Sequence, residues 1–175
     1  MSIQQGFAIW MTGIPASGKS SITRELVKKL EIRGVSVVVL ESDDMRKILT
    51  PEPTYSQEER DAFYQSLTLI GELITRNGVN VVFDATANKR TYREYAHALI
   101  PRFVEVFIQC PLEVCMQRDP KGIYRRAATG KTSTVPGIQS PYEPPLKPDI
   151  TLDGQNPPEA SADTVLDFLK HLLYI

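Results

Sequence analysis

Four residues near the N-terminus have the types and the spacing that bind phosphate. Gly13, Gly18, Lys19 and Ser20 stand in the order Gly-x4-Gly-Lys-Ser, directly after the apolar run at residues 7–12. The glycines let backbone N–H groups turn inward around a phosphate, and the N-terminus of a following helix adds a favourable field. Lys19 would hold the β- and γ-phosphates of ATP and Ser20 would ligate Mg²⁺. The other ATP-binding residues expected in this loop are Ala16, Ser17 and Ser21.

Acidic residues follow two of the apolar runs that we interpret as strands. Asp43 and Asp44 come just past residues 35–41, and Asp84 lies near the end of residues 79–85. Ligands bind at the carboxyl ends of the strands in open parallel sheets, where an acid can ligate Mg²⁺ or accept the proton of an attacking hydroxyl. Capping of the next helix is the rival role for any single acid. We expect catalytic roles for Asp43 and Asp84, metal ligation by Asp43, and capping by Asp44.

Residues 119–148 are irregular and rich in proline, and we call them the lid segment. A long irregular segment in a compact domain is more often a functional lid than a structural necessity. Phosphoryl transfer needs positive charge around the moving group and exclusion of water, and basic residues flanked by Gly122 and Gly130 suit both needs. A solvated basic face is the alternative. The cations in and beside this segment are Arg118, Lys121, Arg125, Arg126 and Lys131.

The rest of the chain alternates short β-branched runs with longer helical patterns. This alternation is typical of a parallel sheet covered on both faces, and it predicts an α/β phosphate-loop fold with five strands. The expected strands are residues 7–12, 35–41, 79–85, 103–109 and 149–153. The expected helices are residues 18–33, 57–76, 90–99, 111–118 and 160–173, with a brief helix at 123–128.

Length and charge narrow the functional classes. The 175 residues fit one domain, and the net charge of −1 favours neither long nucleic acid nor an anionic membrane. The N-terminus has no basic region before its short apolar run, so we expect neither a signal sequence nor a membrane span, and a cytoplasmic location. Cys110 and Cys115 match no metal or CxxC spacing, and we expect two reduced thiols.

The second half of the chain closely resembles adenylylsulfate kinases. The resemblance lies in FVEVFIQCPLEVCMQRDPKGIYRRAATGK at residues 103–131 and GIQSPYEPPLKPDITLD at residues 137–153, and the phosphate loop extends it over most of the chain. Enzymes of that family transfer the γ-phosphate of ATP to the 3′-hydroxyl of adenylyl sulfate. The resemblance therefore implies a kinase that uses ATP and Mg²⁺ on this small-molecule acceptor, and a homodimer, since the family often forms dimers.

The resemblance also assigns roles position by position. Asp43 and Arg46 match the second acid and the substrate-contacting arginine of the family's motif after the second strand. Tyr55 stands where the family has a phenylalanine that packs on the substrate adenine, Arg60 matches the arginine of a nearby Asp-Arg pair, and Arg118 belongs to the ATP side. Lys121 is implied as a catalytic and substrate-binding residue. The remaining expected acceptor-binding residues are Gly122, Ile138 and Arg90. Arg90 and Arg93 are anion-binding candidates because they follow the end of an expected strand.

Four positions on the acceptor side depart from the family pattern. Gln65 and Ser66 replace a pair of arginines, Ala87 replaces a serine, and Val135 replaces a second stacking phenylalanine. Loss of a charge-assisted hydrogen bond costs about 1.5 to 3 kcal/mol, and loss of one base-stacking ring about 1 to 3 kcal/mol. The ATP half of the family pattern is thus intact, whereas the acceptor half departs from it at these four positions, which we call the edited positions.

Two alternatives follow from these departures. The sequence FDATANKRTYR, which contains Asp84, resembles small kinases that act on nucleic-acid ends or other hydroxyl compounds, so the acceptor could be a different alcohol. A noncatalytic ATP-binding sensor is the second alternative, although Asp43, Arg46 and the basic lid segment argue against it. An assay of phosphate transfer separates these readings.

Overall fold

The chain folds around a parallel sheet of five strands. The computed structural model describes residues 4–132 and 134–175. All pairings between neighbouring strands are parallel, and the strand order is β2-β3-β1-β4-β5. The predicted strands are confirmed with ends shifted by at most two residues, and they are β1 (Ala8–Thr12), β2 (Val37–Glu41), β3 (Asn80–Asp84), β4 (Phe103–Gln109) and β5 (Ile150–Asp153).

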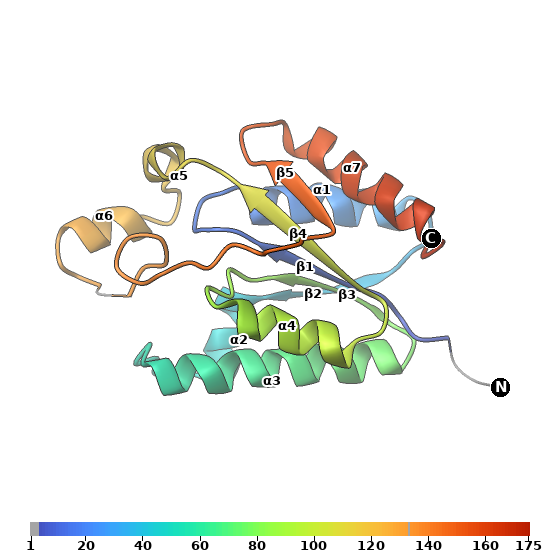
Figure 1. The fold of residues 1–175 in the computed structure, drawn as a ribbon, viewed down its shortest axis with the longest axis horizontal. Helices are drawn as coiled ribbons and strands as arrows, with labels where there is room; N and C mark the ends of the chain where they lie inside the picture. Colours follow the sequence, from blue (N-terminus) through green and yellow to red (C-terminus); the bar gives the residue numbers. More distant parts are fainter. Residues whose placement is uncertain (1–3, 133) are drawn as a thin grey trace.

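Helices cover both faces of this sheet (Figure 1). Helices α1 and α7 lie on one face, and α2, α3 and α4 lie on the other. Helices α5 and α6 lie beyond the carboxyl ends of the strands, at the edge where the predicted acids were expected. The helices are α1 (Lys19–Glu31), α2 (Ser42–Leu49), α3 (Gln57–Arg76), α4 (Arg90–Leu99), α5 (Leu112–Arg118), α6 (Ile123–Ala128) and α7 (Pro158–His171).

Side chains of β1 alternate between two hydrophobic cores. Ile9 and Met11 belong to the core under α1 and α7, whereas Trp10 packs toward α3 and α4. The Trp10 ring stacks on Phe83 of β3 with 4.4 Å between centroids. A strand covered on both faces must be apolar throughout, which explains the unbroken hydrophobic runs in the sequence. Gly71 lets α3 approach this core closely, because a Cβ atom there would lie 2.1 Å from the Phe83 ring.

Helix α2 was not predicted. It has eight residues, its N-cap is Glu41, and no side chain caps its first turn. The expectation that Asp44 caps a helix is wrong, because this carboxylate instead pairs with Lys47 at 2.5 Å in the same helix. Acidic residues in a first turn still favour the helix through its dipole. Within the described residues, no helix is both long and apolar enough to span a membrane.

Candidate active site

The phosphate loop connects the buried strand β1 to helix α1. Gly18 is the N-cap of α1 with a φ of 112°, a left-handed conformation that glycine adopts without strain. Lys19 is buried, and its ammonium donates to the carbonyl oxygens of Gly13 at 2.9 Å and Ile14 at 3.0 Å. The lysine thus folds back over the loop it belongs to. Ser17, also in the loop, is fully buried.

A carboxylate lies beside this loop at the end of β3. Asp84 is buried, and burial raises the pKa of its carboxyl against the opposing effects of Lys19 and of a hydrogen bond with Ser20. Burial likewise lowers the pKa of Lys19, partly offset by the charge of Asp84. Strand β3 is the direct neighbour of β1, so the parallel register brings this acid next to the phosphate loop. The sequence-based expectation for the place of Asp84 is met.

The second acid meets the lid segment. Lys121 donates to the carboxylate of Asp43 at 2.5 Å and to that of Glu41 at 3.1 Å. Burial alone would lower the pKa of Lys121, but these two carboxylates raise it above the ordinary value. Sequence reasoning selected Asp43 and Lys121 but missed Glu41, which ends β2. The ion pairs connect the lid segment to the carboxyl edge of the sheet.

Arg46 of α2 points into a group of aromatic rings. Its guanidinium carbon lies 4.0 Å from the ring centroid of Phe63 and 5.2 Å from that of Tyr55, and Arg46 also pairs with Glu59 at 3.4 Å. Cation–π contacts of this kind fix the direction of a guanidinium. The structure brings Arg46 and Tyr55 into contact, and their expected place on the acceptor side stays a prediction.

The Tyr55 loop is held by Glu59. The Glu59 carboxylate accepts from the backbone N–H of Thr54 at 2.5 Å and of Tyr55 at 3.3 Å, and Ser56 caps α3 through the Glu59 N–H. The Tyr55 side chain stays 42% exposed, so the ring is free to contact a ligand. The role of Glu59 was not predicted, although Ser56 and Glu59 form the Ser-x-x-Glu capping pattern.

Arg60 joins this loop to the lid segment. Its guanidinium is buried and donates to the carbonyl oxygens of Tyr55 at 3.2 Å and Thr134 at 2.7 Å. In this conformation it holds the Tyr55 loop against the lid segment. Arg90 lies farther along the same edge, where its backbone N–H donates to the Glu143 carboxylate at 2.9 Å.

The N-terminal part of the lid segment contacts the phosphate loop. Gly122, with a φ of 63°, is the N-cap of α6, and Asp119 accepts from the backbone N–H groups of Tyr124 and Arg125. The Tyr124 hydroxyl donates to the Pro15 carbonyl at 2.8 Å. The Tyr124 bond connects α6 to the phosphate loop. Sequence reasoning did not identify Asp119 as a capping residue.

Arg118 and Ile138 border the loop from two other directions. Arg118 ends α5 and donates to the carbonyl of Gly154 at 2.8 Å, after β5. Ile138 is 45% exposed and lines a cavity of about 580 Å³ together with Ile14 and residues at the end of β4. Both residues therefore lie close to the phosphate loop. The ATP-binding role expected for Arg118 and the acceptor-binding role expected for Ile138 stay predictions.

The four edited positions have different environments. Gln65 is exposed and Ser66 half-buried on α3, whereas Ala87 is fully buried and donates its backbone N–H to the Tyr64 hydroxyl at 3.1 Å. Val135 is 4% exposed and packs in a small core with Cys115 and Tyr124. Val135 thus occupies the interior of the lid segment and presents no surface for a stacked base.

Both cysteines are free thiols, as expected from their spacing. Cys115 is buried in the small core under α5, and burial together with Cys110 raises its pKa to about 12. A thiol with so high a pKa is a poor nucleophile and a poor metal ligand. Of the described residues, no three His, Cys, Asp or Glu side chains are grouped as a metal site.

Comparisons with known proteins agree on one family. The family model described as adenylylsulphate kinase matches residues 5–153. The adenylyl-sulfate kinase of Rippkaea orientalis is 42% identical over 147 residues, which are 84% of this chain and 81% of that protein. That of Halothermothrix orenii is 34% identical over 176 residues, covering 100% of this chain and 95% of that protein.

The comparison of structures gives the same result. The Mycobacterium tuberculosis APS kinase CysC, solved in complex with AMPPNP and APS, superposes with a TM-score of 0.89 at 33% identity, and the match covers 95% of this chain and 98% of that one. A shikimate kinase from Aquifex aeolicus matches with a TM-score of 0.60 at 18% identity, which reflects the shared fold alone.

Proposed function

The chain belongs to the adenylylsulfate kinase family, and on that premise we propose that it transfers the γ-phosphate of ATP to the 3′-hydroxyl of adenylyl sulfate. The products are 3′-phosphoadenylyl sulfate and ADP. The observation that carries the proposal is that the family match runs through residues 5–153 and so includes both the phosphate loop and the whole lid segment.

The ATP side of the reaction uses the phosphate loop. Backbone N–H groups between Gly13 and Ser21 cradle the phosphates, and Lys19 exchanges its two carbonyl partners for phosphate oxygens when ATP binds. Arg118, at the end of α5, contacts the nucleotide from the other side. The negative charge of the phosphates favours the charged form of the buried ammonium, whose pKa burial lowers in the protein without nucleotide.

The residues around Ser20 fit a magnesium ion. Mg²⁺ is usually bound by one or two carboxylates together with substrate phosphates, and the buried Asp84 beside Ser20 provides such a donor set. The raised pKa of this carboxyl records a cost of burying its charge, which a cation offsets. Magnesium bound there would neutralise charge on the transferring phosphoryl group. Asp43 is the second candidate ligand.

On the acceptor side, Asp43 orients the 3′-hydroxyl and accepts its proton. Its carboxylate lies 2.5 Å from Lys121, so the same contact brings a positive charge to the place where negative charge develops. Gly122 permits α6 to close over both substrates and exclude water. Tyr55 offers an exposed ring for the adenine. Arg46, Arg60, Arg90 and Ile138 complete the proposed acceptor contacts.

The proposal is tested by incubating the protein with ATP, Mg²⁺ and adenylyl sulfate and following ADP and the 3′-phosphorylated product. We expect product formation that Lys19→Ala lowers by about 10³-fold or more, because the charge on the transferring phosphate loses its nearest cation. Lys28→Ala, on the exposed face of α1, is the matched control and should keep full activity. Transfer at an undiminished rate in Lys19→Ala would refute the mechanism.

A second pair of variants tests the base. Asp43→Asn should lower kcat by about 10²-fold or more while ATP affinity changes little, because the amide no longer accepts a proton. Asp44→Asn is the control on the next position of the same helix. Equal rates in both variants would assign Asp43 a purely structural role. ATP binding without transfer to adenylyl sulfate would direct the search to other hydroxyl acceptors.

A further inference from the structure

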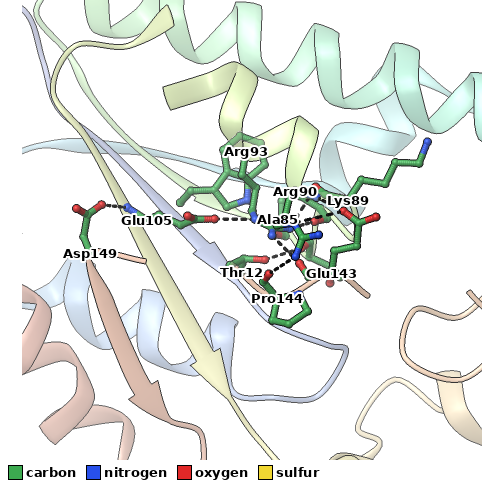
Figure 2. Close-up of polar contacts among 12 residues, drawn as sticks. Thr12, Ala85, Lys89, Arg90, Arg93, Glu105, Glu143, Pro144 and Asp149 are labelled. Atoms are coloured by element: carbon green, nitrogen blue, oxygen red, sulfur yellow. Dashed lines mark hydrogen bonds and ion pairs between the residues drawn. The ribbon is translucent and has the colours of Figure 1, made fainter. Parts of the chain in front are cut away.

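A buried arginine outside the proposed substrate contacts joins three separate segments. Arg93 of α4 is 1% exposed, and its Nε donates to the Glu105 carboxylate of β4 at 2.7 Å. Its two terminal nitrogens donate to the carbonyl oxygens of Ala87, of Lys89 at 3.2 Å and of Glu143 at 2.6 Å. Figure 2 shows Arg93 together with Glu105, Lys89 and Glu143.

The joined segments are β4, the loop after β3 and the C-terminal part of the lid segment. Residues 85–89 continue directly from Asp84, and residues 140–143 belong to the part of the lid segment that leads back to β5. Asn88 bonds this return twice, since its carbonyl accepts from the Glu143 N–H at 2.8 Å and its amide donates to the Pro141 carbonyl at 3.1 Å.

This junction between residues 85–89 and residues 140–143 also contacts the end of β1. The hydroxyl of Thr12 donates to the Thr86 carbonyl at 2.6 Å and lies 3.1 Å from the Tyr142 hydroxyl. Glu143 also accepts from the backbone N–H of Arg90 through its carboxylate. The lid segment is thus tied at this end to the two strands that carry the phosphate loop and Asp84.

A guanidinium suits this place because its donors point in fixed, divergent directions. Lysine carries a single nitrogen on a flexible stem, so it cannot reach Glu105 and carbonyls of both other segments at once. A buried charge pair is also a poor source of stability compared with apolar packing. The arrangement is therefore better explained by a need for defined geometry than by stability alone.

We propose that Arg93, held by Glu105, is a positioning residue that fixes the C-terminal end of the lid segment against the loop after Asp84. Because this end is fixed, the lid segment closes in one position, and Lys121 and Thr134 take up one arrangement relative to the acceptor-binding residues. Arg93 touches neither substrate and acts through Ala87, Lys89 and Glu143. This inference rests on the proposed function, because this arrangement matters for the acceptor hydroxyl.

We call Arg93 with Glu105 the clamp, and hydrogen exchange of backbone amides tests it without any measurement of turnover. In Arg93→Lys we expect the N–H groups of Arg90 and Glu143, which bond across the junction, to exchange about tenfold faster than in the unaltered protein, or faster still. The Ser17 N–H, which bonds within the phosphate loop, should keep its rate. Exchange that is unchanged everywhere, or accelerated equally at Ser17, overturns the proposal.

Kinetics separate positioning from a structural role. We expect Arg93→Lys to raise the KM for adenylyl sulfate and lower kcat, each by about tenfold, with the ATP dissociation constant within about twofold of the unaltered protein. Arg76→Lys, on the exposed end of α3, is the control. A lowered melting temperature with unchanged kinetic constants would overturn the proposal.

A conservative change of the partner provides a second variant. Glu105→Gln keeps the shape and one oxygen acceptor but removes the charge that holds Arg93. It should change the exchange rates, the KM for adenylyl sulfate and kcat in the same directions as Arg93→Lys, but by smaller factors. If Arg93→Lys does not fold, these measurements on Glu105→Gln test the proposal. If the unaltered protein transfers no phosphate to adenylyl sulfate, the proposed function fails, whereas the exchange rates still accept or reject the clamp.

Discussion

Introducing an aromatic ring at Val135 distinguishes the environment seen in the structure from the one the family pattern suggests. On the family pattern, Val135→Phe restores a stacking ring and should strengthen adenylyl sulfate binding by about 1 to 3 kcal/mol. In the structure, Val135 is 4% exposed between Cys115 and Tyr124, and its carbonyl accepts from the N–H groups of Gln139 and Ser140. A larger side chain must therefore enter a filled core.

The expected effect follows from overpacking. Insertion of extra carbons into a packed core costs about 1 to 3 kcal/mol, and in a domain of this size 1 kcal/mol corresponds to roughly 2 to 4 °C in melting temperature. We therefore expect Val135→Phe to lower the melting temperature by roughly 2 to 12 °C and to leave the KM for adenylyl sulfate unchanged or raised. Thermal unfolding and initial rates measure the two effects on one preparation.

Two further variants calibrate this measurement. Val135→Ala should destabilise the protein by about 2 kcal/mol, because it removes two buried methyl groups. Leu146→Phe adds a ring in the same segment at a side chain that is 77% exposed, so the melting temperature should not change. If Val135→Phe lowers the KM for adenylyl sulfate tenfold without loss of thermal stability, the side chain stacks on substrate and the argument from burial is wrong.

Two other predictions concern charges at the carboxyl edge. Burial raises the pKa of the Asp84 carboxyl, so the folded chain binds the carboxyl proton more tightly than the unfolded chain. The free energy of unfolding therefore falls as the pH rises from the pKa of Asp84 in the unfolded chain through its pKa in the folded chain. Asp84→Asn should therefore raise the melting temperature at neutral pH without Mg²⁺ while abolishing Mg²⁺-dependent transfer; a lower melting temperature would contradict this sign. Lys121→Met should reduce kcat by about 10²-fold, with almost no change in melting temperature because half-exposed ion pairs contribute about 0 to 1 kcal/mol. A loss of stability without a loss of rate would make the pairs of Lys121 with Asp43 and Glu41 structural.

The fold was predictable because its sheet is buried on both faces. The central residues of strands such as β1 and β3 must then be apolar, and this leaves a signal that short sequence windows contain. The place of Asp84 followed from the same reasoning, since neighbouring parallel strands end at the same edge. Helix α2 escaped prediction because it is short, has no side-chain cap and leaves none of its residues buried.

The acceptor side was less predictable because tertiary packing decides which side chains face the ligand. The type of Val135 does not reveal that the lid segment turns this residue inward. Glu41 and Glu59 were missed for a similar reason: their partners, Lys121 and the Tyr55 loop, are set by how segments meet. The Ser-x-x-Glu pattern at Ser56 was the one local signal that could have identified Glu59.

Arg93 illustrates the limit of reasoning from residue types, because the sequence suggested it as an anion-binding candidate, whereas its buried guanidinium bonds to groups of the protein itself. Three of its four hydrogen-bond partners are backbone carbonyl oxygens, which every residue carries. The residue types of Ala87, Lys89 and Glu143 therefore do not indicate that these positions bind Arg93. The Glu143 partner lies 50 positions away along the chain. A motif search therefore finds the groups that we propose to bind phosphate, whereas the residue that we propose to align the lid segment with Asp84 is identified only from the contacts between separate segments. If the clamp acts as proposed, the edited acceptor positions are only part of what sets acceptor binding, and the geometry of this junction sets the rest.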